Sequence, residues 1–244
     1  REPKPRLGTW GGMVRAKAIA SARSILAANA KGMMLGDEQN FRDAIKKMAG
    51  QNPAFIAEVD MSGVPAAVFE KARQVIADSL GCMLAGAGSE LRDAMLSYLD
   101  DGAAGVVPVM GTGRSASPQA AALVNGAFGA ALDYDDLIGS LHPSSVIVSA
   151  LISAIGAAPV SGRHFVESYI IGLEIGAKMA VALGPDHPRR GFHATSTLSG
   201  FAAFAAVARL KRLPVDQVAT GLSLVASQSG GVLCQLGTMT KPLH

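Results

Sequence analysis

Two short segments of this sequence place side chains that can transfer protons or hold anions among small residues. Residues 190–197 read RGFHATST and contain His193, and residues 237–244 read GTMTKPLH and contain Lys241. An imidazole gains and loses a proton near neutral pH, and a lysine ammonium holds a carboxylate as a fixed cation. Because both segments border apolar stretches, these groups are the first candidates for binding or catalysis.

A third segment combines carboxylates with an imidazole around one predicted turn between helices. Asp133, Asp135 and Asp136 follow an Ala-rich stretch, and His142 comes shortly afterwards, immediately before Pro143. A carboxylate that accepts a hydrogen bond from an imidazole fixes its tautomer and raises its basicity, as acid–base catalysis requires. The alternative is an acidic loop followed by a helix that starts at His-Pro, and the spacing leaves both interpretations open.

His193 stands where the sequence predicts the start of a helix. The N–H groups of a first helical turn attract anions, and the hydroxyl of Thr195 adds a donor, so a substrate carboxylate can dock beside the imidazole. Arg190 can help to attract the same anion. In the alternative interpretation, His193 only caps or packs against the helix, and Lys241 and Arg190 are exposed to solvent.

Pattern and composition argue against several other classes of function. The histidines, His164 and His187 among them, lack the spacing of metal ligands, so no metal or other cofactor is expected, and these two are interpreted as structural or surface groups. The segment 111–114 (GTGR) lacks the Lys-Ser/Thr of a phosphate loop. Aromatic residues make up 5% of the chain and the net charge is only +3, which argues against a nucleic-acid partner.

The elements that must position these groups are predicted to be helices. Apolar residues recur at helical spacing, Pro65 stands at a first helical position, and only residues 105–111 resemble a strand. The abundance of Ala and Gly favours closely packed helices, and the alternation of strands and helices that an α/β sheet needs is missing. The predicted fold class is all-α, with helices at 65–80, 90–99, 118–132, 143–157, 164–183, 195–211 and 215–229.

Two regions are predicted along the chain. Residues 1–60 form a basic helical extension or docking segment, and residues 61–244 form the helical domain. The uncharged stretch 137–162 is interrupted by prolines, serines and glycines, which favours a buried helix over a membrane span. Cys82 and Cys234 lie in apolar surroundings and are predicted to be buried thiols in a reducing compartment. With no export signal at the start of the chain, the expected location is the cytoplasm.

The order of these motifs resembles the MmgE/PrpD family, which includes 2-methylcitrate dehydratase, cis-aconitate decarboxylase and iminodisuccinate epimerase. The similarity covers about residues 64–244 and rests on several ordered segments: Asn125-Gly, Asp133-Tyr-Asp-Asp, His142-Pro-Ser, Gly191-Phe-His-Ala-Thr and Gly237-Thr-Met-Thr-Lys-Pro-Leu-His. The resemblance implies a large all-helical domain beside a smaller α+β lid domain, and it implies dimerisation. It also implies metal-independent action on small polycarboxylates.

The resemblance assigns roles to four residues of this chain. Asp133 and His142 resemble the pair of the acidic loop, His193 the histidine of the Gly-Phe-His turn, and Lys241 the lysine that contacts a substrate carboxylate. The sequence departs from the family at two positions. Ala130 stands where many members have a histidine, and Leu137 stands where a substrate-contacting threonine often follows the acidic run. The loop also looks one residue shorter than in the decarboxylase, and the chain ends where the family continues toward the lid.

Two functions from different classes are therefore expected. The first is a lyase or isomerase for a polycarboxylate, present as a fragment, split subunit or truncated family member. In such an enzyme, His193 or His142 would transfer the proton and Asp133 would orient the reacting groups. Lys241 and the helix terminus would hold a carboxylate of the substrate. Its partners would be the small substrate and either a second copy or a complementary chain that carries the lid. The second is a catalytically silent helical interaction protein that keeps the fold.

Overall fold

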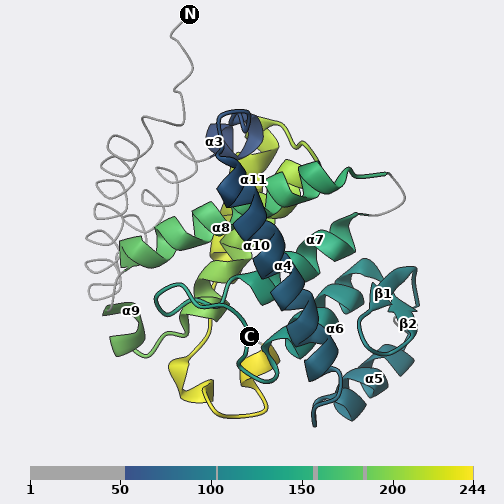
Figure 1. The fold of residues 1–244 in the computed structure, drawn as a ribbon. Helices are drawn as coiled ribbons and strands as arrows, with labels where there is room; N and C mark the ends of the chain where they lie inside the picture. The colour runs from purple at the N-terminus through teal and green to yellow at the C-terminus, as the bar shows by residue number, and fades with distance from the viewer. Residues whose placement is uncertain (1–52, 103, 156–158, 184–185, 244) are drawn as a thin grey trace, which may run out of the picture.

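Helices dominate the computed structural model, which describes residues 53–102, 104–155, 159–183 and 186–243. Within these ranges the only sheet is a two-stranded hairpin, which confirms the all-α prediction (Figure 1). The helices are α3 (Pro53–Glu58), α4 (Ala66–Gly86), α5 (Arg92–Asp100), α6 (Pro118–Ala130), α7 (Ser144–Ala154), α8 (Gly162–Leu183), α9 (Asp186–Arg189), α10 (Ala194–Leu210) and α11 (Val215–Gln228), followed by the 3-10 turns η3 (Leu233–Gln235) and η4 (Lys241–Leu243).

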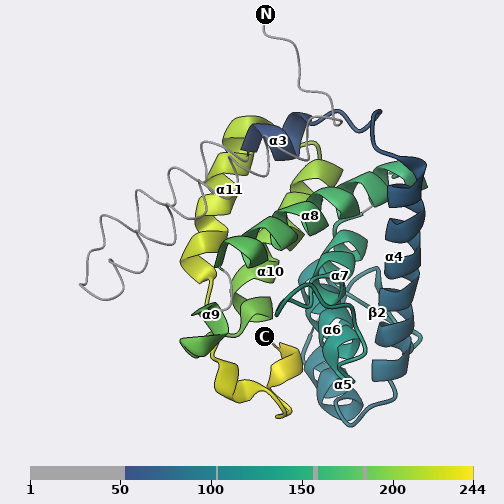
Figure 2. The ribbon, with the colours of Figure 1, turned by 60° about the vertical axis from the view of Figure 1, so that its left-hand side comes forward.

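The longer helices form a continuous series of neighbours. α8 packs on α10, α10 on α7, α7 on α6, and α6 on α4, while α3 and α11 pack together against α10. Figure 2 shows α4, α6 and α7 on one side and α8, α10 and α11 on the other. The C-terminal segment with η3 and η4 runs between the lower ends of the two groups, where η4 contacts α6. This path brings the end of the chain to the loop that follows α6.

Small residues allow the helices to approach closely, as the composition predicted. A Cβ built on Gly86 of α4 would lie 1.9 Å from the carbonyl oxygen of Phe128 in α6. A Cβ on Gly172 of α8 would lie 2.6 Å from the carbonyl oxygen of Ala202 in α10. Real side chains do not approach backbone so closely, so glycine is required at both crossings. Phe128 of α6 is itself fully buried.

The predicted strand at 105–111 forms one half of a hairpin. β1 (Val107–Val109) pairs antiparallel with β2 (Arg114–Ala116), and the second strand was not predicted from the sequence. The buried side chain of Asn125 in α6 holds the turn, because its Oδ1 accepts a hydrogen bond from the Met110 N–H at 2.9 Å. The Asn-Gly motif therefore has a structural function on the hairpin side of α6.

The uncharged stretch 137–162 contains the buried helix that the sequence predicted. Ile147, Val148 and Leu151 of α7 are fully buried in the core that α7 shares with its neighbours. Across the part of the chain that the structure describes, no helix is long and apolar enough to cross a membrane.

The basic helical extension or docking segment predicted at residues 1–60 lies largely outside the described residues. Its last part, α3, is held against the domain by Arg209, which donates to the carbonyl oxygens of Ala57 and Val59 at 2.9 Å each. Of the two cysteines, Cys82 is buried as predicted. The prediction of a buried thiol is wrong for Cys234, which is exposed on η3.

Candidate active site

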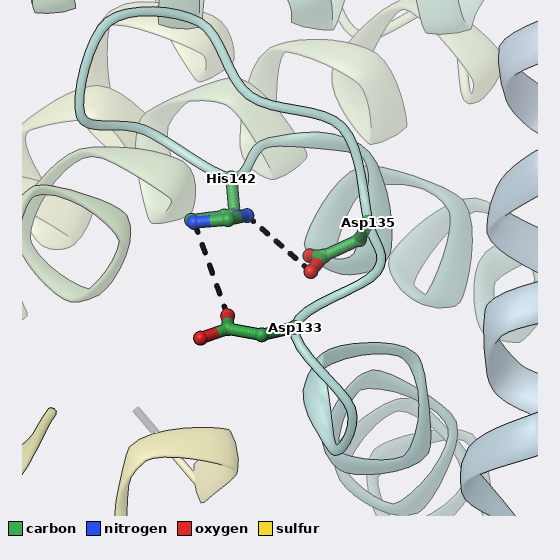
Figure 3. Close-up of side chains that lie close together, drawn as sticks. All are labelled: Asp133, Asp135 and His142. Atoms are coloured by element: carbon green, nitrogen blue, oxygen red, sulfur yellow. Dashed lines mark ion pairs between the residues drawn. The ribbon is translucent and has the colours of Figure 1, made fainter. Parts of the chain in front are cut away.

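The loop between α6 and α7 places three of the candidate side chains around one another. After α6 ends, Asp133 adopts a left-handed backbone conformation with φ of 55°, which aspartate tolerates better than most residues. A bridge between Ile138 and Leu141 closes the loop and returns the chain to His142. Figure 3 shows the His142 ring between the carboxylates of Asp133 and Asp135.

The two nitrogen atoms of His142 face different carboxylates. Nδ1 lies 3.3 Å from Oδ1 of Asp135, and Nε2 lies 4.0 Å from Oδ1 of Asp133. The Asp135 side chain is completely buried, whereas 64% of the Asp133 side chain is exposed. The inner carboxylate is therefore a fixed partner of the ring, and the outer one is open to solvent.

Lys241 joins this cluster from the far end of the sequence. Its ammonium group on η4 contacts the Asp133 carboxylate, and the lysine side chain is almost completely buried. The contact forms because η4 packs against α6, directly before the loop that carries Asp133. Three of the residues singled out in the sequence, Asp133, His142 and Lys241, are thus brought together.

The contact between Asp135 and His142 shifts their pKa values in opposite directions. Burial raises the pKa of Asp135, but the His142 imidazole and the Ser145 hydroxyl oppose this effect and leave the pKa below its usual value. The Asp135 carboxylate raises the pKa of His142 above its usual value, against the effects of burial and of the Lys241 charge. Asp135 is therefore an anion at neutral pH, and His142 holds its proton more firmly than an ordinary histidine.

His193 and Thr195 belong to the same region through the start of α10. His193 is the buried N-cap residue of this helix and has an extended backbone. The Thr195 hydroxyl accepts a hydrogen bond from the His142 backbone N–H at 3.1 Å. Both residues line a cavity of about 140 Å³, together with Lys241 and with small residues of α6 and α7. Asp133 and His142 lie beside this cavity rather than in its lining.

The C-terminal segment is fastened to the turn that precedes α10. The Leu233 N–H donates to the Gly191 carbonyl at 2.7 Å, and the His193 N–H donates to the Gly231 carbonyl at 3.2 Å. Phe192 forms a bridge with Val232 in the same place. These backbone bonds orient the segment that leads to Lys241.

A metal ion is disfavoured by the charges already present. Ligand atoms of Asp133, Asp135 and His142 lie within 4.8 Å of one another, a spacing compatible with a metal ion. However, Asp133 already pairs with the Lys241 ammonium and Asp135 with His142, so protein cations balance both carboxylates. The arrangement suits proton transfer and anion binding better than a metal centre.

Comparison with known protein families shows to which family the chain belongs. The model of the MmgE/PrpD N-terminal domain matches residues 51–244. The chain belongs to the MmgE/PrpD family. The similarity noted in the motifs is thereby confirmed, and the matched residues begin before residue 61 and include α3.

Two curated fungal proteins are similar to this MmgE/PrpD domain. A cis-aconitate decarboxylase-like protein, oryM, of Aspergillus oryzae is 30% identical over 190 residues, which cover 73% of this chain and 39% of the relative. The cis-aconitate decarboxylase of Aspergillus terreus is 28% identical over 191 residues, which cover 73% of this chain and 38% of the relative. The chain thus spans about two fifths of the length of these relatives.

The remaining predicted residue lies apart from the MmgE/PrpD cluster. Arg190 is exposed in the turn before α10 and does not line the cavity, so its contact with substrate stays a prediction. His187 bonds to the Thr197 hydroxyl at 2.7 Å and stacks on Phe192, and His164 contacts the Leu210 carbonyl at 3.2 Å. Both histidines make structural contacts, as predicted.

Sequence reasoning did not single out Asp135 as a site residue. It named the acidic run but gave a role only to Asp133, because nothing in the spacing tells which carboxylate faces the imidazole. The available signal was the pair Ser144-Ser145 at the start of α7, since each serine hydroxyl binds one of the two adjacent aspartates, Asp136 and Asp135.

Proposed function

We propose that this chain supplies the helical part of a lyase or isomerase that acts on a small di- or tricarboxylate, such as cis-aconitate or 2-methylcitrate. The observation that carries the proposal is the meeting of Asp133, His142 and Lys241 beside a cavity lined by His193 and Thr195. The names of the two similar fungal proteins, cis-aconitate decarboxylase and the cis-aconitate decarboxylase-like protein oryM, point to the same class of substrate.

The proposed chemistry needs one acid–base group and one anion site. In a dehydration, a base removes the proton from a carbon next to a carboxylate, and the hydroxyl of the neighbouring carbon takes up a proton and leaves as water. In an epimerisation, a base removes the proton in the same way and an acid returns a proton to the opposite face of that carbon. In a decarboxylation, the bond to a carboxylate carbon breaks, carbon dioxide leaves, and the remaining electron pair takes a proton from an acid. His142, whose pKa is raised by the Asp135 carboxylate so that the protonated ring is favoured, suits delivery of a proton, and His193 is the second candidate for this step.

Carboxylate binding is assigned to Lys241 and the start of α10. The lysine offers a positive charge at the cavity wall, and the first N–H groups of a helix of this length attract anions. Thr195 adds a donor, because a hydroxyl that accepts one hydrogen bond keeps its own hydrogen.

We further propose that a second copy or a complementary lid-bearing chain completes the site. The cluster holds two carboxylates, of Asp133 and Asp135, and two cations, of His142 and Lys241, so a polycarboxylate needs positive charge from elsewhere. Large apolar side chains are also exposed around the loop and the C-terminal segment: Tyr134, Leu137, Leu236, Met239 and Leu243. Light scattering over a wide concentration range tests self-association, and a strictly monomeric species would contradict the second copy.

Turnover is the direct test of the proposed reaction. The chain is incubated with cis-aconitate or 2-methylcitrate, and the products are followed by NMR. Loss of carbon dioxide from the first identifies a decarboxylase, and loss of water from the second identifies a dehydratase. Conversion should be lost in His193→Ala and Lys241→Ala and kept in Lys211→Ala, a control at an exposed lysine outside the cavity.

A catalytically silent interaction protein is the second candidate. The observation that favours it is the charge balance, because Lys241 already pairs with Asp133 and His142 with Asp135. This candidate predicts that neither acid is converted and that binding of either acid ignores the His193→Ala and Lys241→Ala substitutions. Conversion that depends on these two residues would exclude it.

A further inference from the structure

Asp135 is the most deeply buried charged group of the cluster. Its side chain, on the loop between α6 and α7, is completely withdrawn from solvent. Oδ2 accepts a hydrogen bond from the Ser145 hydroxyl at 2.8 Å, and Oδ1 lies 3.3 Å from Nδ1 of His142. The Ser145 hydrogen bond anchors Oδ2, while Oδ1 faces the imidazole as a close ion pair without a hydrogen bond of good geometry.

A carboxylate in this position selects which nitrogen of His142 exchanges protons. An anion beside Nδ1 favours the tautomer with the hydrogen on Nδ1, because that hydrogen then points at the negative charge. The opposite nitrogen, Nε2, faces Asp133 on the open side of the cluster, where Lys241 also lies. The backbone N–H of His142 is bonded to Thr195, so the residue is anchored from a second direction.

We infer that Asp135 is a positioning residue of this site: it keeps a hydrogen on Nδ1 of His142 and leaves Nε2 as the atom that gives or takes the substrate proton. The step itself is a simple transfer, in which the N–H bond at Nε2 breaks as a C–H bond forms, or the reverse. The part that concerns substrate rests on the proposed function. The part that concerns the histidine is a property of the chain alone.

The neighbouring aspartate provides a matched comparison. Asp136 is also largely withdrawn from solvent, but it faces the core: its Oδ2 accepts from the Ser144 hydroxyl at 2.7 Å, and that hydroxyl bonds to Tyr169 at 2.6 Å. Burial raises the pKa of Asp136, the opposite of the direction for Asp135. Two adjacent carboxylates therefore serve different partners, and only one of them contacts the imidazole.

The groups that face His142 are few and come from two elements. Asp133 and Asp135, on its own loop, favour the charged ring, and Lys241, on η4, opposes it. Removing the charge of Asp135 should therefore lower the pKa of His142, since the remaining Asp133 is further away and exposed. Asp136, on the same loop, also interacts electrostatically with the ring, but it makes no contact with it, so removing its charge should have a smaller effect.

The experiment is an NMR titration of His142 in the full chain, with carbon-13 in the histidine rings and the signal assigned through His142→Gln. Asp135→Asn should lower the pKa of His142 and shift the neutral ring away from the Nδ1–H tautomer, while Asp136→Asn should leave the tautomer unchanged and lower the pKa by less. Ser145→Ala keeps the charge but removes one anchor, so it should disturb the tautomer with a smaller change in pKa. If Asp135→Asn does not fold, this variant still tests the inference.

Two results would overturn the inference. One is an unchanged pKa and tautomer in both Asp135→Asn and Ser145→Ala, and the other is an equal change in Asp136→Asn. No substrate is present in the titration, so failure of the proposed reaction does not affect it. Where turnover is found, Asp135→Asn should lower kcat by up to about 100-fold, with KM little changed, because it weakens proton transfer rather than carboxylate binding.

Discussion

The Thr195 hydroxyl, in the first turn of α10, accepts a hydrogen bond from the backbone N–H of His142 at 3.1 Å. The two residues lie far apart in the sequence, and this bond joins the acidic loop to the helix start that carries His193. It therefore connects the proton-transfer cluster with the cavity, the two halves of the proposed site.

This bond predicts different effects for two small substitutions of Thr195. Thr195→Val has nearly the same shape but cannot accept the bond, so the His142 N–H loses its partner, and the free energy of unfolding should fall by about 1 to 3 kcal/mol. Thr195→Ser keeps the hydroxyl and should cost clearly less. Urea denaturation of the three proteins measures both values, and equal losses would show that the bond is unimportant.

The close crossing of α4 and α6 predicts opposite outcomes for two glycines of one helix. Gly86→Ala would push a methyl group into the Phe128 carbonyl and should destabilise the protein by about 1 to 3 kcal/mol. At Gly81, a Cβ meets nothing within 4 Å, so Gly81→Ala should stabilise the helix by about 0.5 to 1 kcal/mol. Thermal unfolding followed by circular dichroism gives the sign of each change, and two changes of the same sign would contradict the described packing.

The Asp135–His142 pair predicts a pH window for its contribution to stability. The pKa of Asp135 is lowered by folding, so its contribution is present above the unfolded value of 3.8 and is lost as the pH falls through the folded value. The pKa of His142 is raised, so its contribution is complete below 6.5 and is lost as the pH rises through the folded value. The coupling should therefore be largest between these two pH values.

A double-mutant cycle with Asp135→Asn and His142→Gln measures this coupling as a free energy of unfolding. We expect about 0.5 to 3 kcal/mol near pH 5.5, the usual range for residues in contact, and a smaller value at pH 3 and pH 9. A coupling that does not depend on pH would show that the two side chains interact through shape rather than charge.

The helices could be predicted from the sequence because their signals are local. Pro118 at a first helical position and the Pro214-Val-Asp break mark helix starts that the structure reproduces, at α6 and α11. The strand β2 could not be predicted, because three residues such as Arg114–Ala116 become a strand only through pairing with β1. Cys234 was misplaced for a related reason, since its apolar neighbours lie on an irregular segment rather than in a helix.

The site could be predicted in its members but not in its geometry. The residue types of Asp133, His142 and Lys241 suggested function, and the family resemblance gave them roles. Their meeting depends on η4 packing against α6, a contact between segments more than a hundred residues apart. Which of two adjacent aspartates faces the imidazole depends on the path of the loop between α6 and α7, which a helical or strand periodicity does not encode.

Calorimetric titration with cis-aconitate tests the central claim most directly, namely that the cluster and the cavity form one polycarboxylate site. Lys241→Met keeps the buried stem but removes the charge, whereas Lys211→Met removes a charge from an exposed position outside the cavity. Loss of the Lys241 ammonium should weaken binding by about 1 to 3 kcal/mol, the scale of a charge-assisted hydrogen bond, and the Lys211 variant should bind as the unmodified chain does. Equal affinity in all three proteins would contradict the account.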